Sequence, residues 1–150
     1  MDRPYVVGID IGGQSAKIGI VDTRGTVLSQ TAIKSNDTNS HVEFIENLCS
    51  AVEKLAEKAN IPMSKIRGIG IGAPNANYYT GTIENAVNLT FGGMKVIPFA
   101  DLMSERIGLP VRLTNDANAA AVGEMTYGAA RGMKNFITIT LGTGVGSGIV

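Results

Sequence analysis

Apolar and polar positions alternate in three short segments at the start of the chain. The segments cover residues 5–11, 16–21 and 26–33, and the tetrapeptides Gly-Gly-Gln-Ser (residues 12–15) and Asp-Thr-Arg-Gly (residues 22–25) separate them. Alternation with a period of two is typical of β-strands, and glycine-containing tetrapeptides between such segments are typical of tight turns. The opening of the chain therefore predicts an antiparallel meander of three strands.

A helical periodicity follows after a polar stretch. Its apolar stripe consists of Ile45, Leu48, Val52, Leu55 and Ala59, which recur at the spacing of one helix face. Ser40 and Glu43 match a capping box, in which the serine side chain accepts from the N–H of residue 43 and the glutamate reaches back to the N–H of residue 40. We expect a helix over residues 41–59 that ends at Asn-Ile-Pro, residues 60–62.

Residues 66–72 form another alternating segment, in which every second position from 68 to 72 is glycine. One face of this predicted strand therefore carries few side chains, which lets another element or a ligand come close. The next stretch, residues 75–97, has no clear period and contains only Glu84 and Lys95 as charged residues. We expect it to be a long irregular connection.

The remaining segments continue the alternation of helices and strands. Pro98 suits the first position of a short helix over residues 98–107, and Gly108 suits its end. A strand over residues 111–114, an alanine-rich helix over residues 117–127 and a strand–turn–strand unit over residues 136–150 follow.

The order β-β-β-α-β-α-β-α-β-β predicts an α/β fold in which hairpin strands extend a parallel core, giving a mixed sheet with flanking helices. The last hairpin is built like the first, with an apolar strand that runs into a glycine turn. This likeness indicates an internal repeat. We expect residues 1–134 to form one lobe and residues 135–150 to be the first hairpin of a second lobe.

Composition excludes several classes of protein. Thirteen lysines and arginines balance thirteen aspartates and glutamates in a chain of 150 residues, which argues against binding to nucleic acid or to an anionic membrane, because both favour a basic excess. The single cysteine, Cys49, excludes a disulfide framework and favours a reducing compartment. With no signal-peptide pattern and no apolar run of membrane-spanning length, we expect a cytoplasmic protein.

Two glycine turns are candidates for phosphate binding: the first glycine turn, residues 12–15, and the second glycine turn, residues 142–144 (Gly-Thr-Gly). Glycine lets backbone N–H groups converge on an anion. Neither turn is a P-loop or a Rossmann fingerprint, because Lys-Ser/Thr is missing and each turn leads into a strand. Both are also ordinary hairpin turns. Asp10, just before the first turn, is suited to hold Mg²⁺ or its waters.

Asp116 is the candidate general base. It ends a predicted strand and begins a predicted helix, so its carboxylate could simply cap that helix. A carboxylate at the carboxyl end of a strand in an α/β sheet can also accept a proton from a substrate hydroxyl, which is the task of a base in phosphoryl transfer.

Side-chain amides are frequent between residues 75 and 118: Asn75, Asn77, Asn85, Asn88, Asn115 and Asn118. Amides donate and accept hydrogen bonds, which suits a neutral polyol such as a sugar, although asparagine is also a common turn residue. A connection as long as residues 75–97 is uncommon without a binding role, which favours ligand contact. His41 and Cys49, in contrast, are interpreted as a surface residue and a packing residue of the same helix.

Five motifs, in this order and at this spacing, resemble the ROK family of bacterial glucokinases, related sugar kinases and sugar-responsive repressors. They are Gly-Ile-Asp-Ile-Gly-Gly (8–13) with Lys17, Gly-Ala-Pro (72–74), Asn-Leu (88–89), Asn-Asp-Ala-Asn-Ala-Ala-Ala-Val-Gly-Glu (115–124) and Leu-Gly-Thr-Gly-Val-Gly (141–146). The resemblance covers the chain and implies a two-lobed kinase whose ribonuclease-H-like lobes, of the actin and hexokinase type, hold ATP in the cleft between them.

The resemblance also implies roles for individual residues. Asp116 matches the family's catalytic base, and Asn88 and Asn115 match its sugar-binding positions. The phosphate-binding positions are Asp10, Gly12 and Gly13 in the first turn and Gly142, Thr143 and Gly144 in the second. Two positions depart from the family pattern: Gln14 stands where threonine is usual, and Asn75 stands where glycine is usual. We keep Gln14 as a phosphate contact and Asn75 as a sugar contact.

These observations predict an ATP- and Mg²⁺-dependent hexose kinase of the glucokinase type. The family's zinc motif and adenosine-binding segment would lie beyond Val150, so we expect no zinc ligands in this chain, and the chain alone should have little or no activity. An apolar hairpin over residues 136–150 without its sheet has open edges, so we expect it either to pack against another copy of the chain, giving a homo-oligomer, or to be poorly ordered.

Two alternatives remain at this point. One is the sugar-sensing module of a repressor, which would need a DNA-binding helix-turn-helix before the first strand, where only four residues precede Tyr5. The other is a sugar-binding lobe without catalysis. The identity of the sugar, and ATP or polyphosphate as donor, stay open.

Overall fold

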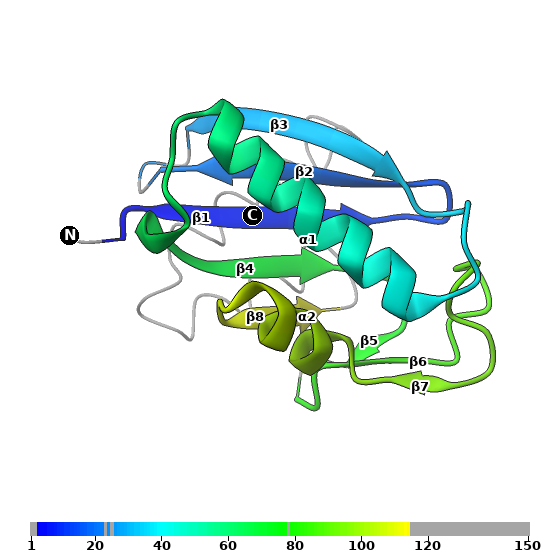
Figure 1. Ribbon diagram of the computed structural model, residues 1–150. Coiled ribbons are helices and arrows are strands. Elements are labelled where there is room, and N and C mark those ends of the chain that lie inside the picture. The colour runs from blue at the N-terminus through cyan, green and yellow to red at the C-terminus, as the bar shows by residue number, and fades with distance from the viewer. Residues whose placement is uncertain (1–2, 23, 25, 78, 115–150) are drawn as a thin grey trace.

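The computed structural model describes residues 3–22, 24, 26–77 and 79–114. In this part of the chain, five strands form one mixed sheet in the order β3-β2-β1-β4-β8 (Figure 1). The strands are β1 (Tyr5–Ile11), β2 (Ser15–Val21), β3 (Val27–Lys34), β4 (Ile66–Gly72) and β8 (Val111–Thr114). The first three are antiparallel neighbours, and β1, β4 and β8 run parallel. The predicted meander on a parallel core is confirmed.

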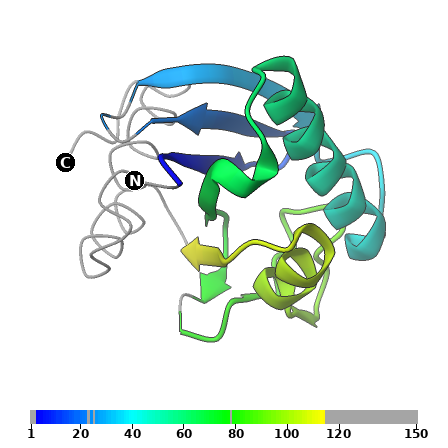
Figure 2. The ribbon, with the colours of Figure 1, turned by 60° about the vertical axis from the view of Figure 1, so that its left-hand side comes forward.

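Two helices of the described region, α1 (His41–Lys58) and α2 (Phe99–Ile107), lie on the same face of this sheet (Figure 2). Ser40 is the N-cap of α1, and its Oγ accepts a hydrogen bond from the N–H of Glu43 at 3.1 Å. The second half of the predicted capping box is wrong, because the N–H of Ser40 donates to Thr38 Oγ1 instead. The threonine hydroxyl lies two residues away and satisfies the donor that Glu43 was expected to satisfy.

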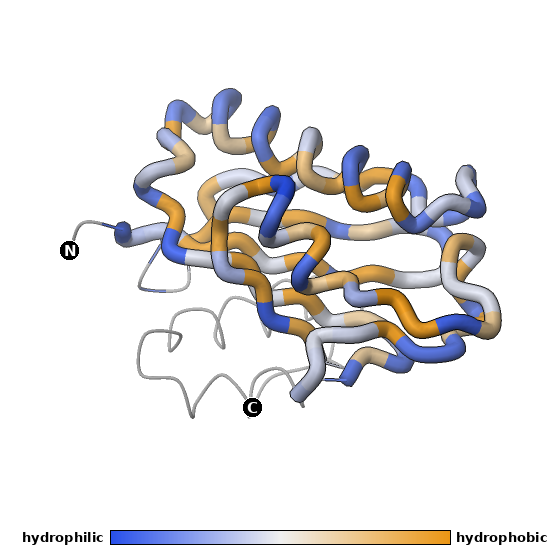
Figure 3. The backbone as a smooth tube through the Cα atoms, turned by 60° about the horizontal axis from the view of Figure 1, so that its bottom comes forward, coloured by the Kyte–Doolittle hydropathy of each residue, from blue (hydrophilic) through white to orange (hydrophobic). Residues whose placement is uncertain are grey.

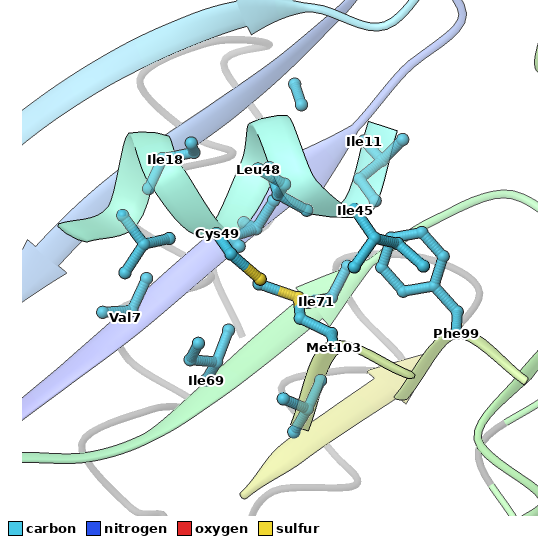
Figure 4. Packing of buried hydrophobic residues seen from close by; sticks show 14 of the residues in the cluster. Val7, Ile11, Ile18, Ile45, Leu48, Cys49, Ile69, Ile71, Phe99 and Met103 are labelled. Carbon is cyan, nitrogen blue, oxygen red and sulfur yellow. The ribbon is translucent and has the colours of Figure 1, made fainter. Parts of the chain in front are cut away.

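Apolar side chains between the sheet and the helices form the core. The hydropathy colouring shows apolar positions along the central strands and on the side of α1 that faces them (Figure 3). Val7, Ile18 and Ile69 from three neighbouring strands point toward Leu48 and Cys49 of α1 (Figure 4). Burial raises the pKa of the Cys49 thiol to about 11, so the thiol is neutral and packs as a small apolar group, as expected.

The second helix begins one residue later than predicted. Pro98 is the N-cap of α2, with a non-helical ψ of 64°, and not its first helical residue. The predicted end is confirmed: Gly108 adopts the left-handed conformation, with φ 78°, and its N–H donates to the carbonyl of Ser104. A short 3₁₀ helix, Met63–Lys65, precedes β4 and was not predicted.

Residues 75–97 are more regular than expected. Three short strands in this described segment, β5 (Ala76–Asn77), β6 (Thr82–Glu84) and β7 (Val96–Ile97), form an antiparallel sheet in the order β5-β6-β7. Strands of two or three residues leave no readable period, which explains the wrong prediction. The segment is anchored to the core, because the ring of Phe91 stacks on that of Phe44, with centroids 4.4 Å apart.

The glycines of the central strands are in register. Gly8 of β1 is paired with Gly19 of β2 on one side and with Gly70 of β4 on the other. Gly8 alternates along β1 with Val7 and Ile9, which belong to the core under the helices, so the glycine row lies on the opposite face of the sheet. The bare face predicted for β4 therefore extends over three strands.

Several predictions fall outside the described residues: the helix over residues 117–127, the hairpin over residues 136–150 and the boundary between residues 134 and 135. Among the helices that the structure describes, none combines the length and the apolar character needed to cross a lipid bilayer.

Candidate functional site

The carboxyl ends of β1, β4 and β8 bring the candidate residues to one edge of the sheet. Asp10 of β1 is paired with Gly72 of β4, and Gly72 is paired with Thr114 of β8. The N–H of Ala73 donates to the carbonyl of Thr114 at 2.9 Å, which closes this end of the sheet. Thr114, the residue directly before Asn115 and Asp116 in the sequence, therefore lies at the edge at which Asp10 lies. Crevices at this edge are the usual ligand sites of α/β sheets.

The first glycine turn joins β1 to β2 at this edge. The N–H of Gly12 donates to the carbonyl of Ser15 at 2.9 Å, which closes the turn. The N–H groups of Gly13 and Gln14 donate no hydrogen bond to any other described residue, and both residues are exposed. Exposed backbone donors without a protein acceptor on a glycine turn are suited to an anion.

Asp10 and Lys17 are the charged residues that flank this turn in the sequence, each two residues away from it. The Cα partner of Asp10 across the strand pair is Lys17 of β2, and both side chains are half-buried. Burial raises the pKa of the Asp10 carboxyl, and the charge of Lys17 partly opposes this shift. A half-buried carboxylate would gain from a nearby cation. Among the described residues, no group of three or more metal-ligating side chains is found. Mg²⁺ is usually held by one or two carboxylates, with water and substrate phosphates as its other ligands.

The segment after β6 meets the first glycine turn. A Cβ atom added to Gly13 would lie 3.3 Å from the backbone oxygen of Asn88, a contact tighter than most real Cβ contacts. Glycine at position 13 therefore lets the two loops approach. Asn88 is exposed at this junction. The structure thus brings a predicted sugar-binding residue next to a predicted phosphate-binding residue, although 75 positions separate them in the chain.

The side-chain amides of Asn75 and Asn77 are engaged within the segment. Asn75 has a φ of 59°, which suits glycine or asparagine, and its Nδ2 donates to the carbonyls of Glu84 and Asn85 at 3.1 and 3.0 Å. Asn77 Nδ2 donates to Glu84 Oε2, and its Oδ1 accepts from the backbone N–H groups of residues 79 and 80. These amides hold the loop together, and Asn75 stands in the backbone conformation that a glycine there would also accept.

Ser35 is a site residue that sequence reasoning missed. It directly follows β3 and is fully buried. Its Oγ donates to the carbonyl of Gly12 at 2.6 Å, and its N–H donates to the carbonyl of Gln14 at 3.0 Å. The sequence gives only a weak signal, a serine at the end of an alternating segment, and nothing in the pattern says which turn it would contact.

A groove of about 450 Å³ lies elsewhere, between β3 and α1, with Lys34, Lys54 and Lys58 among its lining residues. None of the predicted site residues lines it. The remaining candidates, Asn115, Asp116, Gly142, Thr143 and Gly144, lie outside the described residues.

Comparison with known proteins decides the family. Residues 6–150 match the model of the ROK family. The chain belongs to the ROK family. It is 41% identical to a glucokinase of Halalkalibacterium halodurans over 99% of this chain and 44% of that protein. It is 29% identical to a xylose repressor of Caldicellulosiruptor bescii over 99% of this chain and 37% of that protein. The chain thus spans less than half the length of these ROK relatives.

Solved structures support the same assignment. The crystal structure of a ROK family glucokinase from Streptomyces griseus, in complex with glucose and AMPPNP, superimposes with a TM-score of 0.64 at 32% identity and covers 85% of this chain and 38% of that chain. The resemblance to the ROK family and the α/β fold of the actin and hexokinase type, with a mixed sheet and flanking helices, are therefore confirmed.

Proposed function

We propose that the protein phosphorylates a hexose with ATP, as a kinase of the glucokinase type. The observation that carries the proposal is the junction at the carboxyl edge of the sheet. There, the first glycine turn, with its unpaired N–H groups, lies against the backbone of Asn88. Asp10 lies at the same end of the sheet as Thr114, which directly precedes Asn115 and Asp116 in the sequence. The identity of 41% with a glucokinase supports the same reading.

We assign one group of residues to the binding of the sugar and another to the binding of ATP. Asn75, Asn88 and Asn115 would hold sugar hydroxyls, because amides both donate and accept. The first glycine turn, with Gln14, and the second glycine turn, Gly142, Thr143 and Gly144, would bind the phosphates of ATP through backbone N–H groups. Asp10 would hold Mg²⁺ through its water ligands. When bound, Mg²⁺ neutralises charge on the phosphoryl oxygens.

Asp116 would act as the general base. Its carboxylate would take the proton of the sugar 6-hydroxyl while that oxygen forms a bond to the γ-phosphorus and the bond from phosphorus to the bridging oxygen of ADP breaks. The donors of the first glycine turn would stabilise the charge that develops on the transferred group, since fixed N–H groups need no reorganisation during the reaction.

Replacement of Asp116 tests the proposed mechanism. In the full-length protein, Asp116→Asn should lower kcat by a factor of about 10² to 10⁴ and change the dissociation constant of the sugar only slightly, because the amide keeps the shape of the carboxylate. A coupled assay of ATP consumption with a panel of hexoses, together with calorimetric sugar titration, measures both. Full turnover by the variant would remove Asp116 from the role of base.

The similarity to a xylose repressor supports a second candidate, a sugar-sensing module that does not transfer phosphate. The same hexose panel separates the two functions. A kinase consumes ATP in the presence of one or more hexoses, whereas a sensor binds sugar and consumes none.

A further inference from the structure

Ser35 holds the carbonyl side of the first glycine turn. It is one of two polar residues that are buried in the described part of the chain, and it is fully enclosed. Its side chain and its backbone donate to two different carbonyls of the turn, those of Gly12 and Gln14. With the carbonyl of Ser15 bonded to the N–H of Gly12, three carbonyls of the turn have a protein donor.

The bond from Ser35 Oγ decides which way one peptide group faces. In a trans peptide the C=O and the N–H of the next residue point in opposite directions. Because the carbonyl of Gly12 points at Ser35 Oγ at 2.6 Å, the N–H of Gly13 points away from Ser35. This N–H, like that of Gln14, has no acceptor among the described residues.

The orientation of this peptide group needs such a constraint. Glycine stands on both sides of it, at positions 12 and 13, and glycine has the least restricted backbone of all residues. A rotated peptide would present the carbonyl of Gly12, a partial negative charge, where the N–H of Gly13 now lies. An anion would then meet repulsion in place of a hydrogen bond.

We propose that Ser35 is a positioning residue that orients the Gly12–Gly13 peptide so that the N–H of Gly13 can donate to a phosphate oxygen of the nucleotide. The nature of the anion rests on the proposed kinase function. The orientation of the peptide rests on the hydrogen bonds alone. Ser35 touches neither substrate and acts only through the turn.

The test is Ser35→Ala in the full-length protein, with Ser104→Ala as a matched control. Ser104 Oγ also donates to a backbone carbonyl, that of Leu109, at 2.7 Å, but it lies at the end of α2 and does not contact the first glycine turn. Ser35→Ala should raise the KM for ATP and the dissociation constant of AMPPNP about tenfold, or about 1.4 kcal/mol. The KM for hexose should stay unchanged in Ser35→Ala. Ser104→Ala should change none of these three constants.

Ser35→Thr separates positioning from stability. It keeps the hydroxyl but adds a methyl group at a fully buried position, so the thermal midpoint should fall below that of Ser35→Ala. Its KM for ATP should nevertheless stay closer to the wild-type value. If Ser35 had only a structural role, nucleotide affinity would follow stability, and the less stable Ser35→Thr variant would have a higher KM for ATP than Ser35→Ala.

The outcomes distinguish this inference from the proposed function. The role of Ser35 alone is overturned if the wild type is active and Ser35→Ala keeps the wild-type KM for ATP. It is also overturned if Ser35→Ala loses as much affinity for hexose as for ATP. A wild type that binds AMPPNP without turnover leaves the binding comparison intact as the test of Ser35. A wild type that neither binds AMPPNP nor consumes ATP overturns both proposals.

Discussion

The first glycine turn and residues 75–97 both leave the carboxyl edge of the sheet, but different contacts fix their conformations. The turn is short, and Ser35, which directly follows β3, donates to two of its carbonyls. The longer segment is held partly by its own side chains, the amides of Asn75 and Asn77, and partly by the ring of Phe91, which stacks on Phe44 of α1. The turn thus has N–H groups, those of Gly13 and Gln14, without a protein acceptor among the described residues. The longer segment uses two of its four asparagine side chains internally and leaves Asn88 exposed.

The largest effect should come from removing the anchor of the longer segment. Phe91→Ala deletes a ring that is 1% exposed and stacked on Phe44, which should cost about 3–5 kcal/mol of unfolding free energy. Hexose affinity should fall, because Asn88 lies three residues from the anchor, while AMPPNP affinity should fall less. Thermal unfolding and calorimetry measure these effects, with Val87→Ala, at a position 65% exposed, as the control. A wild-type thermal midpoint would contradict the role given to the ring.

Smaller effects on the KM for hexose should distinguish the exposed amide of Asn88 from the amide of Asn75, which is bonded within its own segment. Asn88→Ala should raise the KM for hexose about tenfold, the loss of about one good hydrogen bond. Asn75→Gly should raise it less, because Asn75 Nδ2 already donates to two carbonyls and glycine accepts the φ of 59°. Steady-state kinetics of both variants decide the order. A larger change for Asn75→Gly would make Asn75 the main sugar contact of the pair.

The sequence predicted the sheet well, because its strands are long enough to display a period and are bounded by glycine turns. It failed where elements are very short, as in β5, β6 and β7, and at the Glu43 half of the capping box, where Thr38 competes for the same donor. The approach of Gly13 to Asn88 and the bonds of Ser35 join residues far apart in the chain. No local pattern encodes such contacts, so the motif resemblance could suggest Gly13 and Asn88 but neither their contact nor the bonds of Ser35.

The smallest effect should arise outside both regions, at the ion pairs between the two helices. Arg106 of α2 contacts Glu46 at 2.7 Å and Glu53 at 3.1 Å, both on α1. Exposed pairs of this kind stabilise weakly and are screened by salt. Arg106→Gln should therefore lower the thermal midpoint slightly at neutral pH and not at all in about 1 M NaCl, and should leave both affinities unchanged.

The pH dependence of this difference follows from Glu46. The hydrogen bond from Arg106 lowers the pKa of the Glu46 carboxyl below its ordinary value of 4.5. The stabilisation is therefore fully present above that ordinary pKa and is lost as the pH falls through the lowered one. The thermal midpoints of wild type and Arg106→Gln should therefore converge as the pH is lowered through the acidic range. Lys54→Gln, on α1 like Glu46, is the control. A midpoint difference that persists in strong acid would contradict the assignment.

The most direct measurement is a crystal structure of the full-length protein with a hexose and AMPPNP. We expect a phosphate oxygen within about 3 Å of the N–H groups of Gly13 and Gln14, and the carbonyl of Gly12 still bonded to Ser35. The Asp116 carboxylate should lie within hydrogen-bond distance of the sugar 6-hydroxyl. Phosphates bound away from the first glycine turn, or an Asp116 side chain turned away from the sugar, would contradict this expectation.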